Sequence, residues 1–229
     1  MKKYGLLATF VCAPVLFACS DNSNVDAAKT DKDQAVSVGS TSDTEAQNVA
    51  VASQADAAIA SGVDYHSFAN PNEIRVTHLS LNLTANFETN QLVGDLTLDV
   101  KREKPDNNTL VLDTRALDIQ SVTVDGESVP FEMGEVDPDL GTPLTITLPS
   151  SANAVTVAYS TSPEASGVQW LTPAQTAGKK HPFLFTQAQA VHARSFIPLQ
   201  DSPQVRVTYD AIIKTPEALL AVMSASNDP

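Results

Sequence analysis

One short run near the end of the chain concentrates side chains that form hydrogen bonds. Residues 184–203, LFTQAQAVHARSFIPLQDSP, carry two glutamines one residue apart, Gln187 and Gln189, followed by His192 and Arg194. A neutral amide both donates and accepts hydrogen bonds, so such a pair could form one wall of a binding site for a polar ligand. The alternative is a strand edge followed by a polar loop, with both amides bonded to nearby protein groups.

The other reactive residues do not complete an active site. None of the four histidines begins an H-E-x-x-H zinc helix, and no two of them have the spacing of a structural metal site. The chain has no Gly-rich phosphate loop and no G-x-S-x-G nucleophile elbow. His78 is expected to face solvent from a strand, and His192 has no evident catalytic partner. We therefore expect no catalytic residue and no metal ligand in this chain.

The charge balance excludes one class of partner. The chain has 229 residues, with 14 Lys and Arg against 27 Asp and Glu, which gives a net charge of -13. Contacts to phosphates need clustered cations, and the sequence shows no basic stripe. We therefore expect no nucleic-acid binding. The length is sufficient for one packed domain with appended segments.

The start of the chain has the pattern of an export signal. Lys2 and Lys3 precede an apolar run, residues 5–18, which is too short to span a bilayer as a stable anchor. The run ends in Leu-Phe-Ala-Cys, residues 16–19, which resembles the lipobox of bacterial lipoproteins, where the new N-terminal cysteine carries the lipid. The alternative is an ordinary signal peptide with a chance cysteine at position 19. Because Ser20 stands where an aspartate would favour inner-membrane retention, we expect lipidation of Cys19 and an outer-membrane location in the bacterial cell envelope, facing the periplasm.

The composition divides the chain into three parts. Residues 1–18 are expected to be the lipoprotein signal peptide. Residues 19–63 lack aromatic residues and proline and cannot bury enough apolar surface to offset the entropy of ordering, so they predict a disordered tether. Residues 64–229 form the folded domain. After removal of the signal peptide and lipidation of Cys19, this domain has no cysteine for a disulfide.

Short strands dominate residues 64–229. Apolar residues alternate from Leu79 to Phe87 and again from Leu92 to Val100, which predicts two arms of a hairpin. Asp125-Gly126 lies between two further alternating arms and predicts a tight turn. Alternation returns from Val205 to Ile213, and residues 219–225 could form a last strand. About ten short strands predict an all-β fold, a sandwich or saddle-like sheet.

The segment around the glutamines resembles the N-terminal domain of family M1 zinc aminopeptidases, in particular the leukotriene hydrolase/aminopeptidase branch. That branch carries a Q-W-L-T-P run, then H-P-x-L-F-x-Q-x-Q-A, then a proline and Q-D-x-P. The matching residues here are Gln169–Pro173, His181–Ala190, Pro198 and Gln200–Pro203. The resemblance covers about residues 64–228, and it rests on long gapless runs.

The resemblance implies a role for the glutamines. In most of the family a glutamate at the position of Gln189 binds the free α-amino group of the peptide, and the leukotriene hydrolase branch has glutamine there, as here. Gln187 is expected on the same strand face, one pleat away, so that Ala188 and Ala190 point into the packed domain. We therefore predict Gln189 and Gln187 as substrate-binding residues.

The resemblance also implies what this chain lacks. The G-x-M-E-N loop, the H-E-x-x-H helix and the zinc of the family belong to a catalytic domain that this sequence does not contain. The first hypothesis is a lipid-anchored, non-catalytic substrate-wall domain of an M1-type aminopeptidase, with the missing catalytic domain and a peptide substrate as partners and zinc only in the full-length parent. The alternative is a free-standing, lipid-anchored β module that binds a peptide or a partner protein, and a third is a structural remnant without a ligand.

Overall fold

The computed structural model describes residues 64–227, and their regular structure is almost entirely β-strand. The expected signal peptide (1–18) and tether (19–63), with Cys19, lie outside the described residues. The all-β expectation is confirmed, and neither of the two short helices among residues 64–227 is long and apolar enough to cross a membrane. The elements are β1 (Ile74–Asn86), β2 (Gln91–Arg102), β3 (Thr109–Thr114), β4 (Asp118–Val124), β5 (Glu127–Ser128), β6 (Phe131–Met133), β7 (Thr142–Thr147), β8 (Ala154–Ser160), β9 (Val168–Leu171), η1 (Pro173–Gln175), β10 (Phe183–Thr186), η2 (Ala193–Ser195) and β11 (Thr208–Lys214).

The largest sheet has six strands in the order β11-β1-β2-β8-β4-β5. β1 and β2 are the predicted hairpin, antiparallel over their whole length, with a register shift between Val76 and His78. Leu79, Leu81 and Leu83 are buried on one face of β1, as the alternation predicted. β11 lies parallel to β1 at the edge of this sheet and pairs His78 with Thr208 at its first residue.

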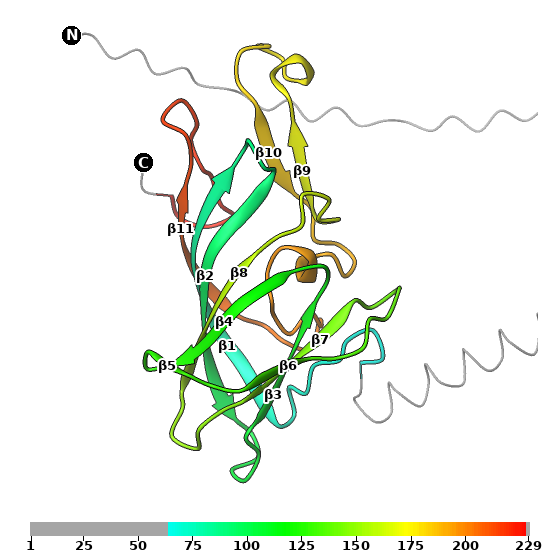
Figure 1. Cartoon of the computed structure of the whole chain (residues 1–229), viewed down its shortest axis with the longest axis vertical. Helices are drawn as coiled ribbons and strands as arrows, with labels where there is room; N and C mark the ends of the chain where they lie inside the picture. Colours follow the sequence, from blue (N-terminus) through cyan, green and yellow to red (C-terminus); the bar gives the residue numbers. More distant parts are fainter. Residues whose placement is uncertain (1–63, 228–229) are drawn as a thin grey trace, which may run out of the picture. The chain divides into compact units, whose positions relative to one another are not determined.

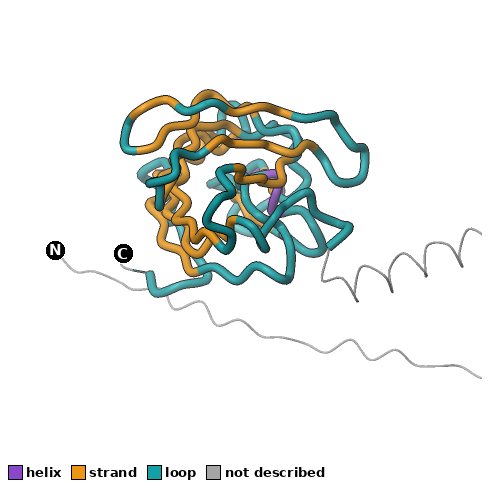
Figure 2. The backbone as a smooth tube through the Cα atoms, turned by 90° about the horizontal axis from the view of Figure 1, so that it is seen from below, coloured by secondary structure: helices purple, strands orange, loops and turns teal. Residues whose placement is uncertain are grey.

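A second sheet of three strands, in the order β3-β7-β6, covers the apolar face of the first (Figure 1). Leu96 and Val157 of the six-stranded sheet and Leu112 and Ile146 of the three-stranded sheet are fully buried in one hydrophobic cluster. Figure 2 shows strands and loops around the outline of this domain, with the purple helical backbone among them. These two sheets therefore form a sandwich with a single core, and a third sheet of two strands, β10-β9, is added to it.

The Asp125-Gly126 turn is a tight hairpin turn between β4 and β5. Both residues have positive φ, 51° and 84°, which is the backbone of a type I′ turn. The turn places Val124 opposite Glu127. A short-range sequence signal therefore determined this connection correctly.

Two predicted strand segments differ from the structure. β11 begins at Thr208, so Val205 and Val207 lie in the preceding loop, although they keep the alternating exposure. Residues 219–225 do not form the expected last strand. Their side chains alternate between half-buried and exposed, but no strand of residues 64–227 forms a ladder with them. An alternating pattern specifies which side chains face the core, whereas a strand also needs a hydrogen-bonding neighbour.

Candidate functional site

β9 and β10 form a two-stranded sheet of their own, and the glutamine run follows its end (Figure 1). Leu184 of β10 is paired with Trp170 of β9, and both pack against the core. The Trp170 ring meets the Phe87 ring edge to face, with centroids 5.0 Å apart. Phe183 and Phe185 lie on the opposite face and are exposed. The hairpin is therefore held through one face and presents an apolar surface on the other.

Gln187 and Gln189 lie in a loop, residues 187–192, which we call the glutamine loop. β10 ends at Thr186, so the prediction that both glutamines share a strand face is wrong. After Gln187 donates its N–H to the carbonyl of Gly167, at 2.9 Å, the chain turns, and the N–H of His192 bonds to the carbonyl of Ala188. The peptide bond between Gln189 and the next residue is cis.

Both glutamine side chains are exposed, as a substrate wall requires. The Gln187 amide oxygen accepts the N–H of Gln189 at 3.3 Å. Ala188 and Ala190 are also exposed, so the expectation that they point into the packed domain is wrong. A turn does not impose the two-sided alternation of a strand, and the whole tip of the loop faces outward. The chemistry of the exposed tip, residues 187–190, is that of neutral amide donors and acceptors, and the titratable side chain of the loop is His192 at its end.

The loop is followed by an arginine that is fully buried. The Arg194 Nε bonds to an Asp201 carboxylate oxygen at 3.0 Å, Nη1 bonds to the carbonyl of Leu140 at 2.8 Å, and Nη2 bonds to the carbonyl of His66 at 2.9 Å. These partners come from three separate parts of the chain. We call Arg194, Asp201 and Asp113 the arginine cluster, because Asp113 lies 3.8 Å from Nη1. The cluster fixes the chain at the point where the glutamine loop re-enters the core.

Asp113 of β3 is the second buried charge of the cluster. Its carboxylate accepts hydrogen bonds from Ser67 Oγ at 2.5 Å, from the N–H of Phe68 at 2.7 Å and from the N–H of Asp201 at 2.9 Å. Burial raises the pKa of the Asp113 carboxyl, whereas these hydrogen bonds and the Arg194 charge act in the opposite direction. The sequence carried one signal that was missed: an aspartate inside the buried strand TLVLDT requires a partner.

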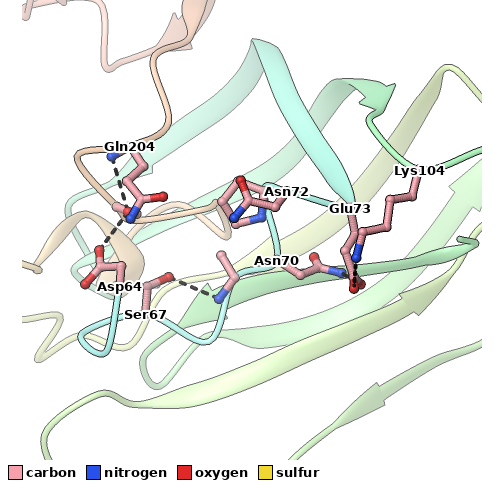
Figure 3. A pocket seen from close by; sticks show the side chains of 10 residues that line it. Asp64, Ser67, Asn70, Asn72, Glu73, Lys104 and Gln204 are labelled. Carbon is pink, nitrogen blue, oxygen red and sulfur yellow. Dashed lines mark hydrogen bonds and ion pairs between the residues drawn. The ribbon is translucent and has the colours of Figure 1, made fainter. Parts of the chain in front are cut away.

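A polar pocket of about 260 Å³ lies beside the first described residues (Figure 3). Glu73 accepts hydrogen bonds from Asn70 and Lys104, which hold the pKa of its carboxyl below the usual value. Asp64 accepts a hydrogen bond from Ser202 Oγ at 2.7 Å. Both carboxylates are thus hydrogen-bonded to protein groups. The pocket lies between the start of the domain and residues 202–204.

The β9–β10 hairpin also borders an apolar cleft of about 390 Å³. The cleft lies between β10, the turn end of β1 and β2, and residues 219–223. Phe183 is 54% exposed, Leu220 73% and Val222 71%, which is unusual for large apolar side chains in one place. Because β10 leads directly into the glutamine loop, the apolar cleft and the two glutamines belong to adjacent parts of one surface.

The remaining sequence candidates form no catalytic group. His192 Nδ1 is 2.9 Å from Ser166 Oγ on the surface. His78, which is expected to face solvent, has a half-buried side chain that contacts Thr208 and Asp210 across the parallel pair, both at 2.7 Å. Among residues 64–227, no three His, Cys, Asp or Glu side chains come together in an arrangement that could hold a metal ion.

Residues 70–229 match the model of one protein family, the Peptidase M1 N-terminal domain. Leukotriene A-4 hydrolase of Xenopus laevis is 41% identical over 170 residues, which are 72% of this chain and 28% of that protein. Leucine aminopeptidase 2 of Yarrowia lipolytica is 41% identical over 171 residues, 72% of this chain and 26% of that protein. The chain thus spans little more than a quarter of these relatives.

The fold agrees with that of a solved relative. Yeast LTA4 hydrolase, solved in complex with bestatin, matches with a TM-score of 0.63 and 34% identity over 67% of this chain and 25% of that chain. The structure of the native enzyme from Saccharomyces cerevisiae gives a TM-score of 0.62 at the same identity.

Proposed function

Because the chain belongs to the M1 peptidase family, as its N-terminal domain, we propose that it forms a non-catalytic substrate wall of an M1-type zinc aminopeptidase. In this proposal the zinc and the hydrolytic residues belong to a catalytic domain of the full-length parent. The observation that carries the proposal is the glutamine loop, which exposes two neutral amides at the end of a hairpin anchored in the core.

The chemistry of the loop suits a peptide N-terminus. The amide oxygen of Gln189 accepts a hydrogen bond from an α-ammonium group, and its NH₂ donates to a peptide carbonyl. A hydrogen bond to a charged group contributes about 1.5–3 kcal/mol, and no ion pair has to form. Gln187 accepts the N–H of Gln189 through its own amide oxygen, so it also helps to hold the neighbouring backbone.

The apolar cleft supports the proposed partner. Its exposed phenylalanine and leucine side chains border the hairpin that carries the loop, and an exposed apolar surface of this kind is typical of a protein interface. The relatives extend well beyond the matched segment, which covers 28% of the Xenopus laevis protein. We assign the catalytic domain of the parent as the occupant of this cleft, which brings the glutamine loop to the edge of its active site.

A chimera tests the role of Gln189. Residues 64–229 replace the matching N-terminal region of the Yarrowia lipolytica relative, and kcat/KM is measured on an aminoacyl anilide. Gln189→Ala is expected to lower kcat/KM by about 10–150-fold, the equivalent of one hydrogen bond to a charged group. The control is Gln120→Ala, another exposed glutamine, on β4, which is expected to leave kcat/KM unchanged. Equal kcat/KM for both variants would refute the proposal.

The proposed location depends on the first residues of the chain. A positive start, an apolar run and the lipobox-like residues 16–19 support lipidation of Cys19. In this proposal the domain is tethered to the outer membrane of a bacterial cell and faces the periplasm. Residues 19–63 would then supply the length between the lipid and the domain.

A further inference from the structure

Ser195 lies behind the glutamine loop and is fully buried. Its Oγ accepts the N–H of Gly167 at 2.8 Å and donates to the carbonyl of His192 at 2.7 Å. The first partner begins the segment leading into β9, and the second ends the glutamine loop. The Ser195 hydroxyl therefore links the segment before β9 to the end of the glutamine loop. It donates its one proton to the second segment and accepts from the first with one lone pair.

Gly167 has no room for a side chain. A Cβ atom at this position would lie 2.6 Å from the carbonyl oxygen of His192 and 2.8 Å from the Phe196 ring. The backbone at Gly167 therefore lies directly against the end of the loop, at a distance that only glycine permits. Close backbone approach and the hydroxyl bridge act on the same pair of segments.

The hydroxyl bridge reaches both ends of the glutamine loop through backbone groups. At the first end, the carbonyl of Gly167 accepts the N–H of Gln187 at 2.9 Å. At the last end, His192 donates its N–H to the carbonyl of Ala188 at 2.8 Å. The backbone at Gly167 and at His192 is thus hydrogen-bonded both to the Ser195 hydroxyl and to the loop. A shift of Ser195 would be transmitted to Gln187 and Gln189 by these bonds.

We propose that Ser195 and Gly167 are positioning residues, which set the direction of Gln187 and Gln189 toward the substrate without contacting it. This inference rests on the proposed function of the glutamine loop. Neither residue has an exposed polar atom to offer a ligand, since Ser195 is 0% exposed and Gly167 is buried with its N–H and carbonyl both bonded within the protein. Their effect on a substrate must therefore pass through the loop.

Hydrogen exchange on the full chain tests the bridge itself. Ser195→Ala removes the acceptor of the Gly167 N–H and one of two donors to the His192 carbonyl, which keeps the Ser195 backbone N–H at 3.0 Å, so the loop should open more often. Exchange of the Gln187 amide is expected to accelerate about tenfold, the equivalent of one buried hydrogen bond. The control is Ser202→Ala, which removes another buried hydroxyl, bonded to Asp64 at 2.7 Å, and should leave Gln187 exchange unchanged.

A double-mutant cycle in the chimera tests the effect on catalysis. If Ser195 acts through Gln189, Ser195→Ala lowers kcat/KM in the wild-type background by about tenfold but adds almost nothing in the Gln189→Ala background. Ser195→Cys, with its weaker hydrogen bonds and similar volume, should give an intermediate loss, and Gly167→Ala should behave as Ser195→Ala does. Urea denaturation of each variant establishes that it is folded under assay conditions.

The outcomes separate the two proposals. If Gln189→Ala leaves kcat/KM unchanged, the proposed function is wrong, and the exchange experiment still decides whether Ser195 holds the loop. If Gln189→Ala lowers kcat/KM but the Ser195→Ala effect adds to it fully, the loop binds substrate and Ser195 does not position it. Unchanged exchange at Gln187 in Ser195→Ala would also overturn the positioning role.

Discussion

Replacing Arg194 by methionine should severely destabilise the domain. Methionine keeps an unbranched, apolar side chain in the buried position but removes the cation. The guanidinium bonds to Asp201 and to the carbonyls of Leu140 and His66, so the change removes these three bonds and leaves Asp201 Oδ2 with only the Arg194 backbone N–H at 3.3 Å. It also leaves Asp113, which is 0% exposed, without its counter-charge.

The magnitude follows from the burial of the arginine cluster. Removing one partner of a buried ion pair costs about 3–5 kcal/mol, against a total stability of about 5–15 kcal/mol for a typical domain. For a domain of this size, each kcal/mol lowers Tm by about 2–4 °C, so Arg194→Met should lose roughly 6–20 °C. The assay is urea and thermal denaturation followed by circular dichroism. Arg206→Met, at an exposed arginine, is the control and should stay within about 0.5 kcal/mol of wild type.

The penalty should also depend on pH, through Asp113. Burial raises the pKa of this carboxyl, so the folded state binds its proton more tightly than the unfolded state, and its contribution to stability falls as pH rises above about 3.9. Without Arg194 this pKa rises further, because the opposing charge is gone. The destabilisation by Arg194→Met should therefore grow as the pH is raised from acid to neutral. A pH-independent loss, or one below about 1 kcal/mol, would refute the assignment of Arg194 as the buried counter-ion.

Three further tests use other substitutions. Cys19→Ser should abolish palmitate labelling and membrane partitioning in a bacterial host, and an unlabelled, soluble wild-type product would contradict the lipoprotein assignment. Phe183→Ser and Leu220→Ser should weaken binding of the isolated catalytic part of the Yarrowia lipolytica relative, measured by size-exclusion chromatography. Val136→Ser is the control, because Val136 is 78% exposed and lies outside the apolar cleft, and it should bind as wild type does. Equal binding by all three variants would place the interface elsewhere. Gly126→Ala should cost about 1–3 kcal/mol in free energy of unfolding, because its φ of 84° strains an L residue even though a Cβ there meets nothing within 4 Å. Gly178→Ala is the control, with equal space and no positive φ, and should be neutral or slightly stabilising.

The sequence predicted those parts of the fold that depend on local pattern. The alternation in residues 79–87 and the Asp125-Gly126 turn specify a strand face and a backbone conformation within a few residues, and both are confirmed. The placement of the glutamines failed because β10 ends where its ladder with β9 ends, and a ladder depends on a partner elsewhere in the chain. Exposure of Gln187 and Gln189 agrees with the prediction, while their role in binding stays a prediction.

The buried polar groups behind the loop were not predictable in the same way. Arg194 and Asp113 are 81 positions apart in the numbering of the chain, and nothing local identifies one as the partner of the other. An aspartate in a buried strand does indicate that some partner exists. Ser195 gave no signal at all, because a serine after an arginine is typical of any surface turn. Its bonds are visible only once Gly167 and His192 are brought together.

The parallel pairing of β1 with β11 has a consequence for synthesis on the ribosome. β1 acquires its second neighbour, β11, only when Thr208–Lys214 have emerged from the ribosome. These residues come about 130 positions after the β1 residues with which they pair. Until then β1 presents an open row of N–H and C=O groups along one side, which is a template for pairing with other nascent chains. Such distant pairing is also slow to form. Translation pauses or premature stops before residue 208 should therefore increase misassembly of this domain, and holdase chaperones should engage the nascent chain mainly in that interval.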